Sequence, residues 1–270
     1  MRTFLLLLSL VLGGAAAAEA KVVTEDVRYT HGQLECVGYL AYDDARAERR
    51  PGVIVVHEWW GLNDYAKRRA RQLAEMGYVA LAIDLYGGGK ATTDREEAAK
   101  LAGVLYQNTD LWRDRAKAGF EALAHHSRVD PARIAAIGYC FGGASVLQMA
   151  YSGLPLAGVV SFHGSLAPPR EEDARRIKAR LLVLHGADDP FVSAADIAAF
   201  QEGVRKAGVD WQMEYYGGAV HAFTNPGVDA AGIDGAKYNR NADERSWRRM
   251  QLFFSELFGE SAGRSTRSDE

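Results

Sequence analysis

The stretch "AAIGYCFGGAS", residues 135–145, decides the fold, because it has the pattern of a strand, a sharp turn and the start of a helix. Small and apolar residues lead up to Cys140, Gly138 lies two residues before it, and Gly142 and Gly143 follow it. This pattern matches the motif G-x-S-x-G, in which a strand-to-helix turn presents a nucleophile, with cysteine in place of serine. The sequence therefore predicts a reactive thiol at a strand end.

Apolar runs and helical segments alternate on both sides of this motif. The expected strands are 36–42, 52–58, 78–85, 133–140, 157–164, 179–186 and 211–218. The expected helices are 64–76, 94–106, 110–126, 142–152, 194–207 and 243–258. Several strands are apolar throughout, which is typical of strands that are covered on both faces. The alternation predicts one α/β domain with a mostly parallel central sheet and helices on both faces.

The first 20 residues, "MRTFLLLLSLVLGGAAAAEA", have the layout of a secretory signal peptide, with Arg2, an apolar run and small residues before the cleavage site. The apolar run is short for a membrane span, which needs about 20 residues. We therefore expect a signal peptide at 1–20, one domain at 21–258 and a flexible tail at 259–270. The mature protein is expected to be periplasmic or secreted, with no stable membrane association.

Charge and cysteine content exclude several classes of function. The formal net charge is −3, with both signs spread along the chain, so no nucleic-acid partner is indicated. Cys36 lies in an expected strand and fits a small core residue better than a disulfide partner that would consume Cys140. The segment "GGGK" at 87–90 lacks the spacing of a phosphate-binding loop, so no cofactor is expected.

Functional groups of open parallel sheets gather at the carboxyl ends of the strands. Cys140, Asp189 and His221 follow three such ends in the order nucleophile, acid, histidine, which is the order of the α/β-hydrolase fold. A thiol attacks as thiolate, an imidazole moves the proton, and a carboxylate orients the imidazole. In "HGADDPFVS" the turn presents Asp189 to the site, and Asp188 is expected to be a solvated turn carboxylate.

His221 is the favoured base among seven histidines, because it alone lies on a glycine-rich loop between the last strand and the final helix. A rival hypothesis is a metal-dependent hydrolase whose ligands are His57, Glu58, His163, His185 and His221. No H-E-x-x-H or similarly tight spacing supports it, so no metal site is expected. Asp84, another strand-end carboxylate, is expected to hold loop backbone.

Five stretches, "VVHEWWGLN", "AIDLYGG", "IGYCFGG", "GADDPFV" and "GAVHAFTNP", make the chain resemble the dienelactone hydrolase family over nearly its whole mature length. The resemblance implies that Cys140 is the nucleophile, His221 the base and Asp189 the orienting acid. Glu58 matches a family glutamate that contacts the cysteine and is implicated in its activation. The resemblance further implies a thiol that stays largely neutral until substrate binds.

The same resemblance suggests the remaining parts of the site. The backbone N–H groups of Phe141 and Trp59 would form the oxyanion hole, and Trp60 would wall the pocket or fill the core. Family members that open dienelactones grip the substrate carboxylate with arginines. Here Asn225 occupies one of those positions, and Arg95 is either the match for the other or a helix-surface residue, so a related ester or lactone is the expected substrate.

These observations predict an exported, monomeric hydrolase with a cysteine nucleophile that cleaves a small-molecule ester or lactone. The alternative is a ligand-binding or thiol-sensing protein on a hydrolase scaffold, because fold does not guarantee function. A purely binding protein would have no chemical need for Cys140, Asp189 and His221 together, so the enzyme is favoured.

Overall fold

The computed structural model describes residues 21–259. The expected signal peptide and residues 260–270 of the expected tail lie outside the described residues. Within that part of the chain, no helix has the length and apolar composition required to cross a membrane.

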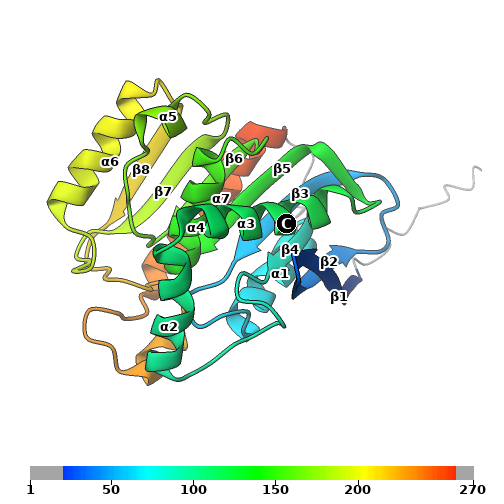
Figure 1. The fold of residues 1–270 in the computed structure, drawn as a ribbon, viewed down its shortest axis with the longest axis horizontal. Helices are drawn as coiled ribbons and strands as arrows, with labels where there is room; N and C mark the ends of the chain where they lie inside the picture. The colour runs from blue at the N-terminus through cyan, green and yellow to red at the C-terminus, as the bar shows by residue number, and fades with distance from the viewer. Residues whose placement is uncertain (1–20, 260–270) are drawn as a thin grey trace, which may run out of the picture.

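The described residues form one eight-stranded sheet in the order β1-β2-β4-β3-β5-β6-β7-β8 (Figure 1). The strands are β1 Val22–His31, β2 Leu34–Asp43, β3 Arg50–Val56, β4 Val79–Ile83, β5 Val129–Tyr139, β6 Gly158–Phe162, β7 Arg180–Gly186 and β8 Trp211–Tyr216. Strand β2 pairs antiparallel with β1 and β4, and all other pairs are parallel. The predicted mostly parallel sheet is thereby confirmed.

Helices cover both faces of the sheet, as predicted. They are α1 Asp64–Glu75, α2 Arg95–Tyr106, α3 Thr109–Ala124, α4 Phe141–Tyr151, α5 Glu171–Ala174, α6 Ala194–Lys206, the 3₁₀ helix η1 Val228–Ala231 and α7 Arg240–Phe258. Apolar residues of α2, α3, α4 and α6 pack on one face with alternate strand residues such as Ile54 and Val56. Residues of α1 and α7 pack on the other face with Val53 and Val55.

The short helices α5 and η1 are not among the expected elements, and two further differences concern strands. Strand β1 is absent from the predicted set, because its residues are exposed or only partly buried and give no apolar run. The third strand ends at Val56 instead of residue 58, so His57 and Glu58 lie just beyond the sheet. Because His57 and Glu58 are not strand residues, their side chains need not point to opposite faces of the sheet.

The parallel strands bring the predicted functional segments to one edge of the sheet. Val56 at the end of β3 pairs with Gly138 of β5, and Tyr139 pairs with Phe162 at the end of β6. Glu58 and Cys140 therefore emerge from neighbouring strands. The loops after β7 and β8 carry Asp189 and His221 to the same edge.

Candidate active site

Cys140 lies at the tight turn between β5 and α4. Its backbone has φ 54° and ψ −115°, a conformation that costs free energy for any residue with a side chain and that clusters at functional sites. A Cβ on Gly138 would come within 2.0 Å of the Gly142 carbonyl oxygen, and a Cβ on Gly142 within 2.2 Å of the Val56 carbonyl oxygen. The elbow therefore requires glycine at both positions.

Asp189 and His221 form a direct contact in the predicted arrangement. His221 Nδ1 lies 2.8 Å from Asp189 Oδ2, and the Asp189 side chain is fully buried. The other Asp189 oxygen accepts the Phe191 N–H at 2.9 Å, which fixes the carboxylate. Asp188 is exposed and accepts the Gly218 N–H at 3.1 Å instead. The structure thus brings Asp189 rather than Asp188 to the imidazole.

The charges around His221 favour its protonated form. Burial lowers the pKa of His221, but the negative charge of Cys140 and the hydrogen bond that Asp189 accepts from the imidazole outweigh it and raise the pKa to about 10. Cys140 and His221 line the same cavity. This arrangement can hold a thiolate opposite an imidazolium that is ready to give a proton to a leaving group.

Glu58 is buried in the same cavity but is engaged by Asn225. The Asn225 amide donates to Glu58 Oε2 at 2.6 Å, and its Oδ1 accepts the Gly227 N–H at 2.9 Å. Burial raises the pKa of Glu58 to about 7, although the Asn225 hydrogen bond and the nearby His221 and Arg69 lower it. Among the described residues, the hydrogen-bond partner of the Glu58 side chain is Asn225 rather than the thiol.

Two backbone amides are free to bind an oxyanion. Within residues 21–259, neither the Trp59 nor the Phe141 N–H has a hydrogen-bond acceptor in the protein. Phe141 is the first residue of α4, where backbone N–H groups have no partner within the helix. The Tyr86 hydroxyl donates to the Trp59 carbonyl oxygen at 2.9 Å and so holds the peptide next to it. Sequence reasoning missed Tyr86, because a strand-end tyrosine carries no signal of this contact.

The cavity in front of the thiol has a volume of about 280 Å³. Its walls are largely apolar and consist of Glu58, Trp59, Trp60, Cys140, Ser165, Phe191, His221, Ala222, Val228, Ile233 and Ala236. A second cavity of about 410 Å³ shares Trp60 and Val228 with it and is also lined by Asn225. Trp60, expected to wall the pocket or to fill the core, lines both cavities. No lysine or arginine is among the residues that line the first cavity.

Arg95 contacts the backbone of the loop after η1. It is the first residue of α2, and its guanidinium donates to the carbonyl oxygens of Ala231 and Gly232, the latter at 2.9 Å. It lines neither cavity. Arg95 thus fastens the loop after η1, which fits the expected helix-surface residue, and its contact with substrate remains a prediction. Asn225 lies beside Glu58 and faces the second cavity, so its contact with substrate remains a prediction.

The other strand-end polar residues serve the backbone. Asp84 is fully buried and accepts the N–H groups of Val37, Tyr86, Gly87 and Gly89, as expected for a structural carboxylate. His57 Nδ1 lies 2.6 Å from the Glu58 carbonyl oxygen. Within the described part of the chain, no group of three or more histidine, cysteine or acidic side chains is arranged to hold a metal ion.

The fold and the site define an α/β-hydrolase with a cysteine at the nucleophile elbow. Residues 37–258 match the model of the dienelactone hydrolase family, and the chain belongs to that family. It is thus an ester or lactone hydrolase of the dienelactone hydrolase type, as the sequence predicts.

Known relatives agree with this assignment. A protein of Saccharolobus solfataricus, provisionally named a carboxymethylenebutenolidase, is 29% identical over 234 residues, which cover 74% of this chain and 87% of that protein. Protein usf of Aquifex pyrophilus is 33% identical over 182 residues, or 65% of this chain and 77% of that one. A crystal structure described as a dienelactone hydrolase-like promiscuous phosphotriesterase from metagenomic libraries has a TM-score of 0.86 and 43% identity, covering 88% of this chain and 99% of that chain.

Proposed function

We propose that this protein hydrolyses uncharged carboxylic esters or lactones with Cys140 as nucleophile, His221 as proton carrier and Asp189 as the orienting acid. One observation carries the proposal: the His221 Nδ1–Asp189 Oδ2 contact of 2.8 Å lies beside a cavity that also contains Cys140. A carboxylate in this position fixes the imidazole tautomer and stabilises the imidazolium.

The reaction proceeds in two halves. The Cys140 thiolate attacks the carbonyl carbon, a carbon–sulfur bond forms, and the Trp59 and Phe141 N–H groups stabilise the oxyanion. The carbon–oxygen bond then breaks as the His221 imidazolium gives its proton to the leaving oxygen, which releases an alcohol and leaves a thioester. His221 next takes a proton from water, and the hydroxide attacks the thioester to release the acid and restore the thiolate.

The polarity of the cavity favours an uncharged substrate. Its lining includes a buried acid, Glu58, and no lysine or arginine to pair with a substrate carboxylate. Asn225 replaces one of the arginines that the family resemblance predicts, and Arg95 is engaged with the backbone of residues 231 and 232. Among the described residues, a carboxylated dienelactone therefore finds no lysine or arginine partner in this cavity.

The test compares p-nitrophenyl acetate with a carboxylated dienelactone, using the mature protein and its Cys140→Ala variant. We expect turnover of the aryl ester, a much lower kcat/KM for the dienelactone, and loss of both in the variant. Turnover that survives in the variant would exclude Cys140 as nucleophile. A folded protein with a titratable thiol and no turnover of either compound would support the alternative of a binding or thiol-sensing protein.

Phosphotriesters are a second candidate substrate class. The motivation is the 43% identity over 88% of this chain to a structure described as a promiscuous phosphotriesterase. Phosphotriesters are also uncharged, so they meet the same requirement of the cavity. Release of p-nitrophenol from a dialkyl p-nitrophenyl phosphate, lost in Cys140→Ala, would support this activity; equal release by the variant would exclude the thiol as its source.

We also propose that the protein is exported and that its signal peptide is removed. The support is the layout of residues 1–20, with a basic residue, an apolar run and small residues before Lys21. Mass spectrometry of the protein from a bacterial host should find a chain that begins near Lys21 in the periplasm or medium. A full-length chain in the cytoplasmic or membrane fraction would contradict export.

A further inference from the structure

His163, directly after β6, is fully buried and contacts the backbone of the nucleophile. Its Nδ1 accepts the Cys140 N–H at 3.0 Å, and the same N–H also reaches the Phe162 carbonyl oxygen at 3.0 Å. Because Nδ1 accepts, the ring proton lies on Nε2, which donates to Thr224 Oγ1 at 2.7 Å. One imidazole therefore joins the elbow to the loop that carries His221.

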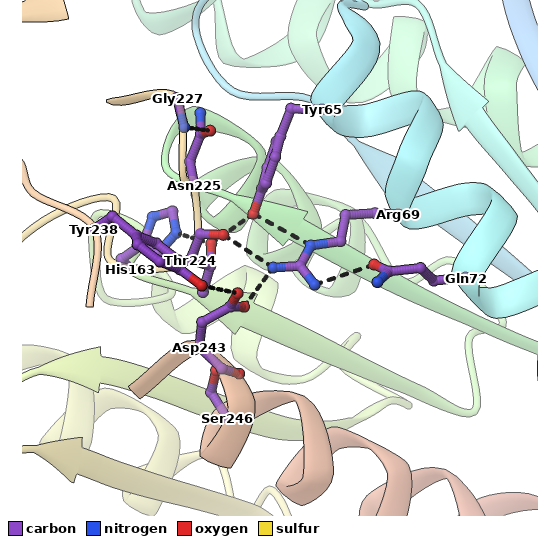
Figure 2. A network of polar contacts seen from close by, with 10 residues as sticks. All are labelled: Tyr65, Arg69, Gln72, His163, Thr224, Asn225, Gly227, Tyr238, Asp243 and Ser246. Carbon is purple, nitrogen blue, oxygen red and sulfur yellow. Dashed lines mark hydrogen bonds and ion pairs between the residues drawn. The ribbon is translucent and has the colours of Figure 1, made fainter. Parts of the chain in front are cut away.

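The hydrogen-bond network of His163 and Thr224 extends to helices α1 and α7, as Figure 2 shows. The Thr224 and Tyr65 hydroxyl oxygens are 2.5 Å apart, and Arg69 Nε donates to the Tyr65 hydroxyl at 3.4 Å. A second Arg69 nitrogen donates to the Thr224 carbonyl oxygen at 3.0 Å and pairs with Asp243 of α7. Thr224 is thereby held through both its side chain and its backbone.

The surroundings keep His163 neutral. Burial lowers the pKa of His163 well below its ordinary value, and the positive charges of His221 and Arg69 lower it further. The ring centroids of His163 and His221 are 5.4 Å apart in an edge-to-face arrangement. A neutral His163 can keep its acceptor toward the Cys140 N–H without competing for the proton that His221 carries.

Thr224 lies three residues after His221 and directly before Asn225, whose side chain holds Glu58. The position of Thr224 thus sets the position of both groups relative to the elbow. Cys140 itself adopts a strained backbone, which persists only where neighbouring contacts over-determine it. The bond from its own N–H to His163 is one such contact.

We propose that His163 is a positioning residue that holds the Cys140 elbow and the loop from His221 to Asn225 in register, so that thiol and imidazole face each other. This inference rests on the proposed function of that site. The expected cost of its loss is misalignment, and a displacement of about 1 Å at a catalytic group can lower the rate by about a hundredfold.

Two substitutions of His163 separate its contacts. His163→Ala removes both hydrogen bonds. In His163→Asn, the Oδ1 can take the place of Nδ1 as acceptor for the Cys140 N–H, and asparagine tolerates the positive φ of 40° found here. We expect His163→Ala to lower kcat/KM for p-nitrophenyl acetate at least about tenfold with little change in KM, and His163→Asn to recover part of that loss.

A matched pair of tyrosines supplies the control. Tyr65 and Tyr139 are both buried, their rings are 5.1 Å apart, and both rings lie near the Arg69 guanidinium. The Tyr65 hydroxyl belongs to the network, whereas the buried Tyr139 hydroxyl has no hydrogen-bond partner among the described residues. Tyr65→Phe is expected to lower kcat/KM, and Tyr139→Phe to leave it within about twofold of the wild type, the range expected where no hydrogen bond is lost.

The deciding readout is the pH dependence of Cys140 alkylation by iodoacetamide in the folded protein. Misalignment of His221 should move the midpoint of this profile upward in His163→Ala and Thr224→Val, whereas a purely structural role would lower only the melting temperature.

An unchanged profile and a kcat/KM within twofold of wild type would overturn the inference. If wild-type protein hydrolyses no ester but the profile still shifts, the proposed function fails and the positioning role stands. If His163→Ala does not fold, His163→Asn and Thr224→Val decide the question.

Discussion

The two cysteines of this protein lie in contrasting environments. Cys36 is fully buried in β2, and burial, followed by the charge of Asp84, raises its pKa to about 11. Cys140 ends a parallel strand on a strained turn, and it shares a cavity with His221. The difference in environment supports the proposal that Cys140, and not Cys36, acts as the nucleophile, because a nearby cation and solvent access favour a reactive thiol.

The sheet also keeps the two thiols apart. In the strand order, β4 and β3 lie between β2 and β5, so three strand spacings separate the strand of Cys36 from the strand that leads to Cys140. At about 4.8 Å per spacing this is about 14 Å, well beyond the reach of a disulfide. The sheet topology thus agrees with the expectation that Cys36 is a core residue.

The largest expected effect separates the two thiols by activity. Cys140→Ala should lower kcat for p-nitrophenyl acetate by at least about 10³-fold, because no other thiol among the described residues lines the cavity. Cys36→Ala should leave kcat/KM near the wild-type value and lower the free energy of unfolding by about 1 kcal/mol, since it empties a small core volume. Steady-state kinetics and urea unfolding measure both. Comparable losses of activity in the two variants would contradict the assignment of Cys140 alone as the nucleophile.

Substitutions of Asp188 and Asp189 test which of the two neighbouring aspartates orients His221. Asp189→Asn should lower kcat by about 10²- to 10⁴-fold, because the amide no longer fixes the His221 tautomer or stabilises the imidazolium. Asp188→Asn should cost far less, since the Asp188 carboxylate is exposed and contacts the Gly218 N–H instead. The reverse ranking, with both variants folded, would assign the acid to Asp188.

The reactivity of the thiols toward iodoacetamide tests their charge environments. His221, whose pKa is raised to about 10, is cationic at neutral pH and lines the same cavity as Cys140, so Cys140 should react with iodoacetamide in the folded protein at pH 7. Cys36 should react only after unfolding, because it is inaccessible to solvent. Mass spectrometry of the labelled peptides distinguishes the two. Slow labelling of Cys140 that speeds up only with a bound substrate analogue would instead favour the gated thiol implied by the family resemblance.

The last prediction concerns stability. Burial raises the pKa of Glu58, as it raises the pKa of Cys36. Between the ordinary value of 4.5 and a pKa of about 7, the unfolded chain releases a proton that the folded protein retains. Stability from this group is therefore lost as pH rises through that window, on the order of 3 kcal/mol in total at about 1.4 kcal/mol per unit.

Glu58→Gln should remove this loss and give a flatter dependence of unfolding free energy on pH between 5 and 8. Glu75→Gln, on the exposed surface of α1, is the matched control and should reproduce the wild-type slope. Denaturant unfolding at four pH values measures both. A Glu58→Gln slope parallel to that of the wild type would show that the pKa of Glu58 is the same in the folded and the unfolded protein.

Much of the site could be predicted because its signals are local in the sequence. The glycines around Cys140 are required by close backbone contacts within the turn, and the choice of Asp189 follows from its spacing after β7. Arg95 could not be placed in the same way, since its partners lie 136 and 137 residues away and depend on the path of the loop after η1. The edge strand β1 escaped prediction for a different reason, because its exposed residues carry no apolar pattern.

The sequence by itself determined the elbow, the order of nucleophile, acid and histidine, the parallel sheet and the membership of the family, since each depends on short motifs or on the periodicity of apolar residues. The tertiary structure alone decided that Asn225 holds Glu58, that Tyr86 binds the Trp59 carbonyl oxygen and that His163 joins the elbow to the loop of His221. The Asn225–Glu58 bond spans 167 residues and the His163–Thr224 bond spans 61. Such contacts arise only when folding brings distant strand ends to one edge, so no local pattern encodes them.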